Sequence, residues 1–172
     1  MDAPPLSIDE IAREAQTFRA TCQTLQLATC SAAGVPTASY APYALSPDGG
    51  FCIYVSELAA HTPNLRSTRS VSVLLIEPEA AAAHLFARRR LTFACDSIHL
   101  PRGSDACTAA LGALTARFGD FIDFLARMTD FHAFELIPRH GSYVRGFAQA
   151  YELPGADYTA IRHLNERGHR NA

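Results

Sequence analysis

The chain has 172 residues, of which 48% are hydrophobic and 19% are charged, and its formal net charge is -2. This length suits one domain with a substantial core, and the composition excludes an intrinsically disordered chain. The charge balance does not favour a nucleic-acid partner, and the longest apolar runs are too short to cross a membrane.

The first half of the chain predicts one helix followed by short strands. Ser7 and Glu10 are spaced as a capping box, and apolar residues then recur at helical spacing. The expected strands, separated by turns rich in Gly and Pro, cover residues 25–30, 35–44 and 51–55. Thr62 followed by Pro63 is typical of a helix start, so a short helix is expected over residues 63–68.

The second half predicts further strands around one long helix. The expected strands cover residues 70–76, 89–95, 131–137 and 142–150, the last two joined by a turn at 138–141. Ser104 caps the long helix, whose apolar face continues beyond Gly119, a point at which the helix can break. Residues 156–164 are expected to form a short final helix before a polar tail.

Short strands joined by hairpins, with helices at the start and after the main sheet, indicate an α+β fold built on an antiparallel barrel. No repeat or linker divides the chain, so we expect one domain over residues 1–172, with a flexible C-terminal tail from about residue 155. The N-terminus lacks the basic start and apolar core of a signal peptide.

The cysteines are dispersed and show no C-x-x-C spacing: Cys22, Cys30, Cys52, Cys95 and Cys107. This pattern favours buried, reduced thiols over metal ligands. Together with the missing signal peptide, it predicts a cytoplasmic protein.

The run Arg88-Arg89-Arg90 begins a predicted strand, and alternation places Arg88 and Arg90 on one face. Because one guanidinium can bind two oxygens of a carboxylate or phosphate at once, the run can act as a clamp for a flavin phosphate or a heme propionate. The alternative is a solvated strand end whose arginines pair with Glu77 or Glu79.

Two histidine positions stand out. His61 lies just before a predicted helix start, where free amides favour an anion, although a lone loop histidine is more often only hydrogen-bonded. His169 follows Gly168 in the C-terminal tail. A histidine in such a tail usually has no specific role, yet a mobile imidazole there can also ligate the metal of a flat cofactor. The remaining histidines show no spacing that signals a site; His132, on the strand face of Asp130, is interpreted as a surface residue or as one paired with its neighbour.

No hydrolase or nucleotide-triphosphate motif is present, but several blocks resemble a known family. The blocks are LQLAT at 25–29, GVPTASYAPY at 34–43, SELAAHTPNL at 56–65, LFARRRLTF at 85–93 and GFAQAY at 146–151. The first two are similar to the opening hairpin of the split barrels related to pyridoxamine-phosphate oxidase. The others resemble the heme-utilisation proteins of the HugZ/HutZ type, and the similarity extends over nearly the whole chain.

The resemblance implies a homodimer with a heme cleft formed by both protomers. It implies heme ligation by His169 within Gly168-His169-Arg170, and a hydrogen bond to that ligand from Asp130 across the interface. A carboxylate that accepts the distal ring proton makes imidazole a stronger donor to iron, which favours oxidative ring opening and iron release. The resemblance also places His61 and the arginine run at this cleft.

Relatives of the same fold bind flavin mononucleotide (FMN) in the corresponding cleft, through basic residues near the helix after the third strand. Here Pro63 occupies a position that is often basic, which leaves His61 and Arg66, beside Asn64, as the nearer phosphate candidates. We therefore expect a heme-binding protein that degrades heme, with an FMN-dependent oxidoreductase or a non-enzymatic heme storage or delivery protein as alternatives.

Overall fold

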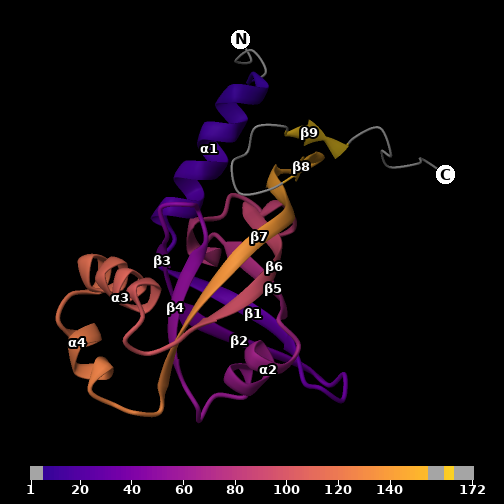
Figure 1. Ribbon diagram of the computed structural model, residues 1–172. Coiled ribbons are helices and arrows are strands. Elements are labelled where there is room, and N and C mark those ends of the chain that lie inside the picture. The colour runs from indigo at the N-terminus through magenta and orange to yellow at the C-terminus, as the bar shows by residue number, and fades with distance from the viewer. Residues whose placement is uncertain (1–5, 155–160, 165–172) are drawn as a thin grey trace.

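The computed structural model describes residues 6–154 and 161–164 of the chain (Figure 1). The helices are α1 (Ile8–Thr21), α2 (His61–Ser67), α3 (Asp105–Phe118) and α4 (Phe121–Ala126). The strands are β1 (Thr24–Cys30), β2 (Pro36–Pro42), β3 (Ala44–Leu45), β4 (Phe51–Ser56), β5 (Ser70–Ile76), β6 (Arg90–Leu100), β7 (Phe131–Gly146), β8 (Gln149–Leu153) and β9 (Arg162–His163). Two 3-10 turns, Glu79–Ala81 and Leu85–Ala87, lie between β5 and β6.

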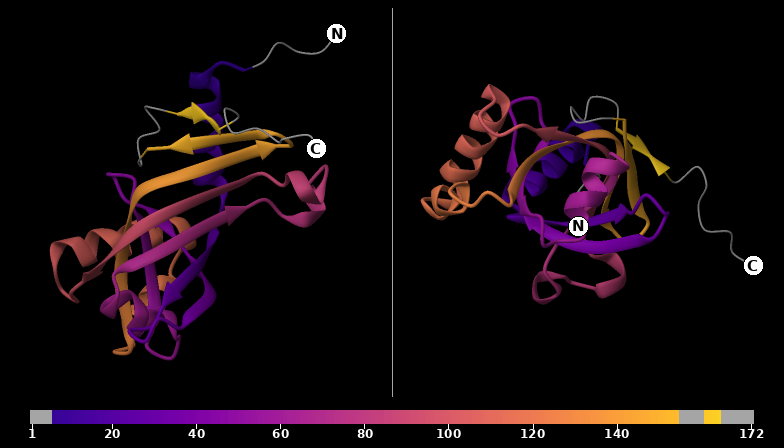
Figure 2. Two further views of the ribbon diagram at one scale, coloured as in Figure 1. Left: turned by 90° about the vertical axis from the view of Figure 1, so that its right-hand side faces the viewer. Right: turned by 60° about the horizontal axis from the view of Figure 1, so that its bottom comes forward.

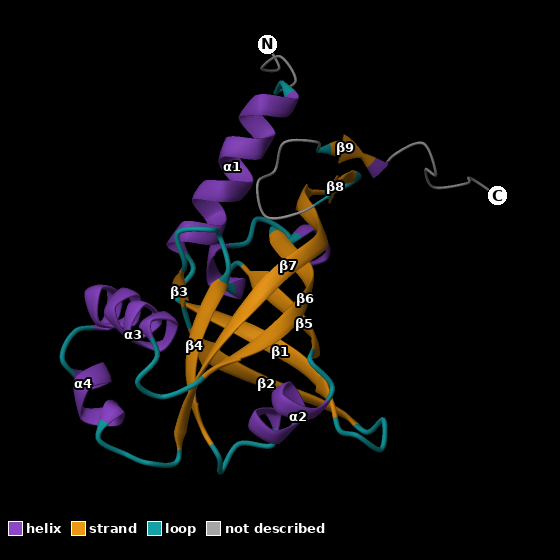
Figure 3. Ribbon diagram, in the orientation of Figure 1, coloured by secondary structure: helices purple, strands orange, loops and turns teal. Residues whose placement is uncertain are grey.

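The strands form one antiparallel, nine-stranded sheet in the order β2-β1-β5-β6-β7-β4-β3, with β8 paired to β7 and β9 to β8. The sheet curves round a common interior, α2 lies across one open end of this barrel, and α1 lies at the opposite end (Figures 1 and 2). Helices α3 and α4 lie beside β4, outside the barrel (Figure 3). Strands β2 and β3 are the two ends of this order and are not paired with each other in the described residues, so the barrel is not closed. The expected α+β class is confirmed.

The interior is formed by alternate residues of the strands. In β1, for example, Leu25 and Leu27 are buried and Gln26 between them is exposed, as the two-residue period of a strand requires. An aromatic series continues this core, because Phe51 contacts Tyr43 at 5.2 Å and Phe93 at 5.7 Å between ring centroids. A second apolar cluster lies between the outer face of β4 and α3, which explains why almost every β4 residue is buried.

Several local predictions are confirmed. The capping box is formed, because the Ser7 amide donates to the Glu10 carboxylate at 2.8 Å and the Glu10 amide donates back to the Ser7 hydroxyl. The long helix ends at Gly119, whose φ of 75° suits glycine, and α4 follows. None of the described helices is both long enough and apolar enough to cross a membrane.

The predicted turn at residues 138–141 is wrong, because β7 continues through it as one strand. A shift in register opposite Ala94 and Cys95 accommodates Pro138, which cannot donate to the strand ladder. Gly141 marks a close approach: a Cβ there would lie 2.4 Å from the Thr92 backbone oxygen. Pro138 and Gly141 suggested a turn, but in the structure they are residues that the close pairing of β7 with β6 can accommodate.

Two further boundaries differ from prediction. Helix α2 begins at His61, since Ala60 is the N-cap and the Thr62 hydroxyl donates to the Ser56 carbonyl at 2.6 Å. The final helix expected over residues 156–164 is not formed at its C-terminal end, where Arg162–His163 is strand β9. The remainder of that segment, residues 155–160, lies outside the described residues, as does the tail from 165 onward.

Candidate functional site

The predicted site residues fall at two ends of the barrel. His61, Asn64 and Arg66 belong to α2, and Asp130 lies just before β7 at the same end. The arginine run lies at the other end, because Ser70 at the start of β5 pairs with Asp96 whereas Ile76 at its end pairs with Arg90. Within one protomer the structure does not bring the two groups together.

Asp130 is held firmly against the end of β4. Its backbone carbonyl accepts a hydrogen bond from the Glu57 amide at 2.8 Å, and its Oδ2 accepts one from the Ser56 hydroxyl at 2.8 Å. Among the described residues nothing hydrogen-bonds to its Oδ1. The carboxylate is therefore oriented by one oxygen while the other remains available as an acceptor, as the support of a metal-bound imidazole requires.

His61 is 5% exposed, and its Nδ1 lies 2.8 Å from the Ser39 hydroxyl on β2. Its Nε2 is buried and has no hydrogen-bond partner in the described part of the chain. Burial lowers the pKa of the ring, so the imidazole is neutral at neutral pH. A buried polar atom without a partner is unfavourable, and a bound ligand would satisfy it.

The other two α2 residues have partners within the chain. The Asn64 amide donates to the buried Thr29 hydroxyl at 3.0 Å, so it fixes α2 to β1. Arg66 lies 3.5 Å from the Glu57 carboxylate. Asn64 is buried, whereas Arg66 is exposed and carries a positive charge that a ligand can reach.

The structure adds Ser56, Glu57, His99 and His132 to this end of the barrel. His132 Nε2 lies 2.6 Å from Glu57 Oε1, and the His99 and His132 rings are 5.7 Å apart between centroids. His132 is thus satisfied by a partner 75 positions away, not by its neighbour Asp130. Only the pairing of β4 with β7, which sets Val55 opposite His132, would have revealed this contact.

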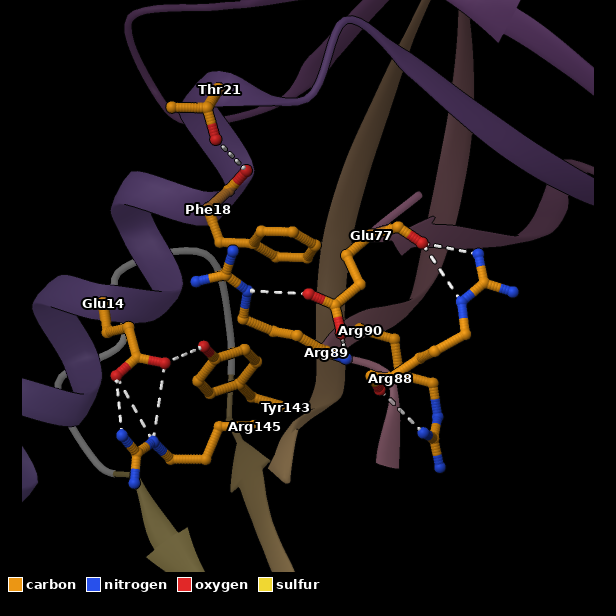
Figure 4. A network of polar contacts seen from close by, with 9 residues as sticks. All are labelled: Glu14, Phe18, Thr21, Glu77, Arg88, Arg89, Arg90, Tyr143 and Arg145. Carbon is orange, nitrogen blue, oxygen red and sulfur yellow. Dashed lines mark hydrogen bonds and ion pairs between the residues drawn. The ribbon is translucent and has the colours of Figure 1, made fainter. Parts of the chain in front are cut away.

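The arginine run is engaged with acidic groups of its own chain (Figure 4). Arg88 donates to the Glu77 carbonyl at 3.1 Å and pairs with Glu79 at 3.2 Å, and the Arg89 amide donates to the Glu77 carboxylate at 2.7 Å. Arg90 donates to the Arg88 carbonyl at 2.9 Å. The alternative of pairing with Glu77 and Glu79 is therefore present in the protomer, and the clamp for an anion stays a prediction.

A second network beside the run connects α1 to β7 (Figure 4). The Tyr143 hydroxyl donates to Glu14 at 2.5 Å, and Arg145 pairs with the same carboxylate at 3.1 Å. Burial opposes ionisation of Glu14, but these hydrogen bonds outweigh it and lower its pKa. Burial and the Glu14 contact raise the pKa of Tyr143. The network holds α1 against β7, and each of its three side chains is engaged with another of them.

His169 and Arg170 lie outside the described residues, so their expected roles are not placed by the structure. In the described ranges, 6–154 and 161–164, no group of three His, Cys, Asp or Glu side chains is arranged to hold a metal ion. The five cysteines are all free thiols.

An antiparallel barrel left open and covered by a short helix, with oriented polar groups at that helix, defines a split-barrel α+β protein. The chain belongs to the pyridoxamine 5'-phosphate oxidase family, which matches residues 11–145. It is 41% identical to the heme oxygenase HutZ of Vibrio cholerae over 157 residues, covering 91% of this chain and 88% of that protein.

Solved structures agree with this assignment. The crystal structure of HutZ from Vibrio cholerae, described as a heme storage protein, has a TM-score of 0.70 at 39% identity and covers 73% of this chain and 88% of HutZ. ChuZ of Campylobacter jejuni has a TM-score of 0.86 at 26% identity, over 98% of this chain and 68% of ChuZ. A heme-binding protein from Mycobacterium smegmatis has a TM-score of 0.76 at 26% identity, over 91% of this chain and 61% of that protein. The expected resemblance is confirmed.

Proposed function

We propose that this protein binds heme and degrades it oxidatively, with release of iron. The observation that carries the proposal is the 41% identity to a heme oxygenase, extending over 91% of the chain. The oriented Asp130 carboxylate and the unsatisfied His61 Nε2 suit a ligand at this end of the barrel. Heme is the substrate, and its iron supplies the oxidative chemistry when it is bound.

Asp130 and His169 divide the work in this proposal. His169 would ligate the iron, and the free oxygen of Asp130 would accept a hydrogen bond from the other ring nitrogen, which orients the imidazole and increases its basicity. Ser56 orients the carboxylate through its hydrogen bond to Oδ2. Arg170, the next residue in the sequence, would pair with a heme propionate.

The proposed cleft requires a homodimer, since one protomer leaves the arginine run distant from α2. The side chains that β1, β2 and β5 direct away from the interior are all uncharged. They include Thr24, Gln26, Ala28, Cys30, Ala38, Tyr40, Ser72 and Leu74. Tyr40, at 66% exposure, belongs to this face and lies opposite Gln26 of β1. Such a surface favours burial against a second copy, which would bring Arg88 and Arg90 of one protomer towards His61, Asn64 and Arg66 of the other. The free thiols support a reducing, cytoplasmic location.

A hemin titration of the purified protein tests ligand binding. We expect a sharp Soret band at one hemin per protomer, and loss of the axial-ligand spectrum in His169→Ala. His163→Ala is the matched control, because His163 is exposed and is also a histidine near the C-terminal end of the sequence. An unchanged spectrum in His169→Ala would overturn the ligand assignment.

A second candidate, heme storage, is favoured by the description of the HutZ crystal structure. Addition of ascorbate to the heme complex separates the two functions. Degradation predicts loss of the Soret band and release of ferrous iron, whereas storage predicts a stable spectrum. A yellow protein that releases FMN on denaturation would instead support the flavin alternative.

A further inference from the structure

A hollow of about 500 Å³ lies where α2 ends and β5 begins, next to β6. Its lining consists of Leu65, Arg66, Arg69, Ser97, Ile98 and His99. We infer that this hollow is a binding site for an oxyanion, the carboxylate or phosphate group of a small molecule. It borders the proposed cleft through Arg66, but neither His61 nor Asp130 lines it.

Ser97 provides the first reason. Ser97 is 2% exposed, and its Oγ has no hydrogen-bond partner in the described part of the chain. Its amide donates to the Arg69 carbonyl at 2.7 Å, which fixes Ser97 directly beside that arginine. Buried hydroxyls are almost always hydrogen-bonded, because leaving water without a new partner is unfavourable. An oxyanion in the hollow would accept the proton that Ser97 now leaves unused.

Arg69 provides the second reason. Its φ is 56°, a left-handed conformation that side chains with a Cβ adopt only with strain. It follows the C-cap Thr68, at the position where helices commonly carry glycine. Among the described residues its guanidinium forms no ion pair or hydrogen bond. An arginine kept at a strained position, without a partner for its charge, indicates that the side chain itself is used.

The electrostatics of the hollow suit an anion. The Arg66 guanidinium lies 3.5 Å from Glu57 Oε1, an atom that also lies 2.6 Å from His132 Nε2, and its side chain is 40% exposed, so a ligand can reach it. Burial, followed by the nearby Arg66 and His132, lowers the pKa of His99. A neutral imidazole at this position can donate one hydrogen bond without adding charge. The hollow is thus locally basic in a chain whose formal net charge is -2.

The shape of the lining limits the ligand. Leu65 and Ile98 form an apolar wall next to the basic groups. Two guanidiniums and a hydroxyl match the several oxygens of a carboxylate or a phosphate, which accept hydrogen bonds in pairs. The hollow therefore fits a small organic acid or phosphate ester better than a bare halide.

The test is thermal unfolding of the full chain in sodium phosphate, sodium succinate or sodium chloride at equal ionic strength. Phosphate or succinate should raise the Tm of the wild type with increasing concentration, as binding to the folded state requires. Arg69→Gly should raise the ligand-free Tm by about 2–4 °C, because glycine removes the left-handed strain. The same variant should weaken anion binding at least about tenfold, measured by calorimetry.

Two matched variants separate strain and charge from binding. Ala148→Gly relieves a similar φ of 55° in the turn between β7 and β8, and should leave anion binding unchanged. Arg13→Gln removes one exposed positive charge on α1, and should also leave it unchanged. Ser97→Ala should keep the ligand-free Tm or raise it, since it deletes an unsatisfied hydroxyl, yet it should weaken binding.

The inference is overturned if phosphate, succinate and chloride give the same Tm, or if Arg69→Gly and Ser97→Ala bind both anions as tightly as the wild type. A parallel titration with hemin distinguishes two sources of the same chemistry. An undiminished phosphate response in the heme complex supports a free anion as ligand. Loss of that response, with weaker hemin binding by Arg69→Gly, supports a heme carboxylate in the hollow.

Discussion

The two ends of the barrel differ in how far their polar side chains are engaged with partners of the same chain. At the α1 end Glu14 is joined to Tyr143 and Arg145, and Glu77 to Arg88 and Arg89. Two buried nitrogens there, Arg19 Nε and Arg89 Nε, lack a hydrogen bond in the described part of the chain, but Arg19 donates to the Gly49 carbonyl through another nitrogen and Arg89 is paired with Glu77. At the α2 end three side-chain atoms have no hydrogen-bond partner in the described part of the chain. They are the buried His61 Nε2 and Ser97 Oγ, and Oδ1 of the oriented Asp130 carboxylate.

Because folding alone favours complete hydrogen bonding, the unsatisfied groups of the α2 end indicate ligands that are yet to bind. The α1 end then has a structural role, and the α2 end a binding role. This difference makes distinct predictions for stability and for binding.

The largest effect is expected from Phe18→Ala. Phe18 is 5% exposed, packs 6.4 Å from Tyr143 between ring centroids, and lies under the Arg89 guanidinium at 4.6 Å. Removal of the ring leaves a cavity and should lower the free energy of unfolding by about 3–5 kcal/mol. Urea denaturation measures the loss, and Leu58→Ala, at 93% exposure, is the control. A loss no greater than that of the control would show that α1 does not stabilise the barrel.

Glu14→Gln should have the next largest effect, a loss of about 1–3 kcal/mol, because Tyr143 and Arg145 lose a charged acceptor. The pKa of Glu14 is lowered in the folded state, so its contribution is complete above the unfolded value of about 4.5 and disappears as the pH falls below it. The stability difference between wild type and variant should therefore shrink in acid. A difference that stays constant down to pH 3 would contradict the ionised network.

Sequence reasoning reached the fold because it depends on local patterns. The capping box at Ser7, the two-residue alternation of β1 and the glycine at 119 each specify their own element. The single strand β7 was missed because Pro138 and Gly141 imitate a turn, and only their partners on β6 show that they serve close pairing. Within the site, Asp130 was reached through resemblance. Its support from Ser56 was missed because the two residues are 74 positions apart and meet only through β4 and β7.

Ser56→Ala tests that support at the α2 end. The loss of one hydrogen bond should cost about 1 kcal/mol of stability, while hemin still binds and ring opening with ascorbate slows. Ser46→Ala is the matched control, since the Ser46 hydroxyl accepts from the Gly50 amide at 2.8 Å in a turn. That variant should lose similar stability and keep the wild-type rate. Equal rates in all three proteins would remove Ser56 from the positioning of Asp130.

The smallest effect is expected from His61, and it should appear as a dependence on pH. Its folded pKa lies below the ordinary value of 6.5, so the unfolded chain takes up a proton that the folded protein resists. The wild type should therefore lose stability as the pH falls below 6.5, and His61→Gln should lose less of it.

The comparison isolates His61 even though burial also lowers the pKa of His99, because His99 is present in both proteins. The measurement is the urea unfolding free energy at several pH values, with His140→Gln as an exposed control. A heme carboxylate that accepts a hydrogen bond from the buried Nε2 would favour the protonated ring and raise the pKa of His61. Hemin should therefore make the wild-type pH dependence shallower, whereas an unchanged slope would place His61 outside the ligand's reach.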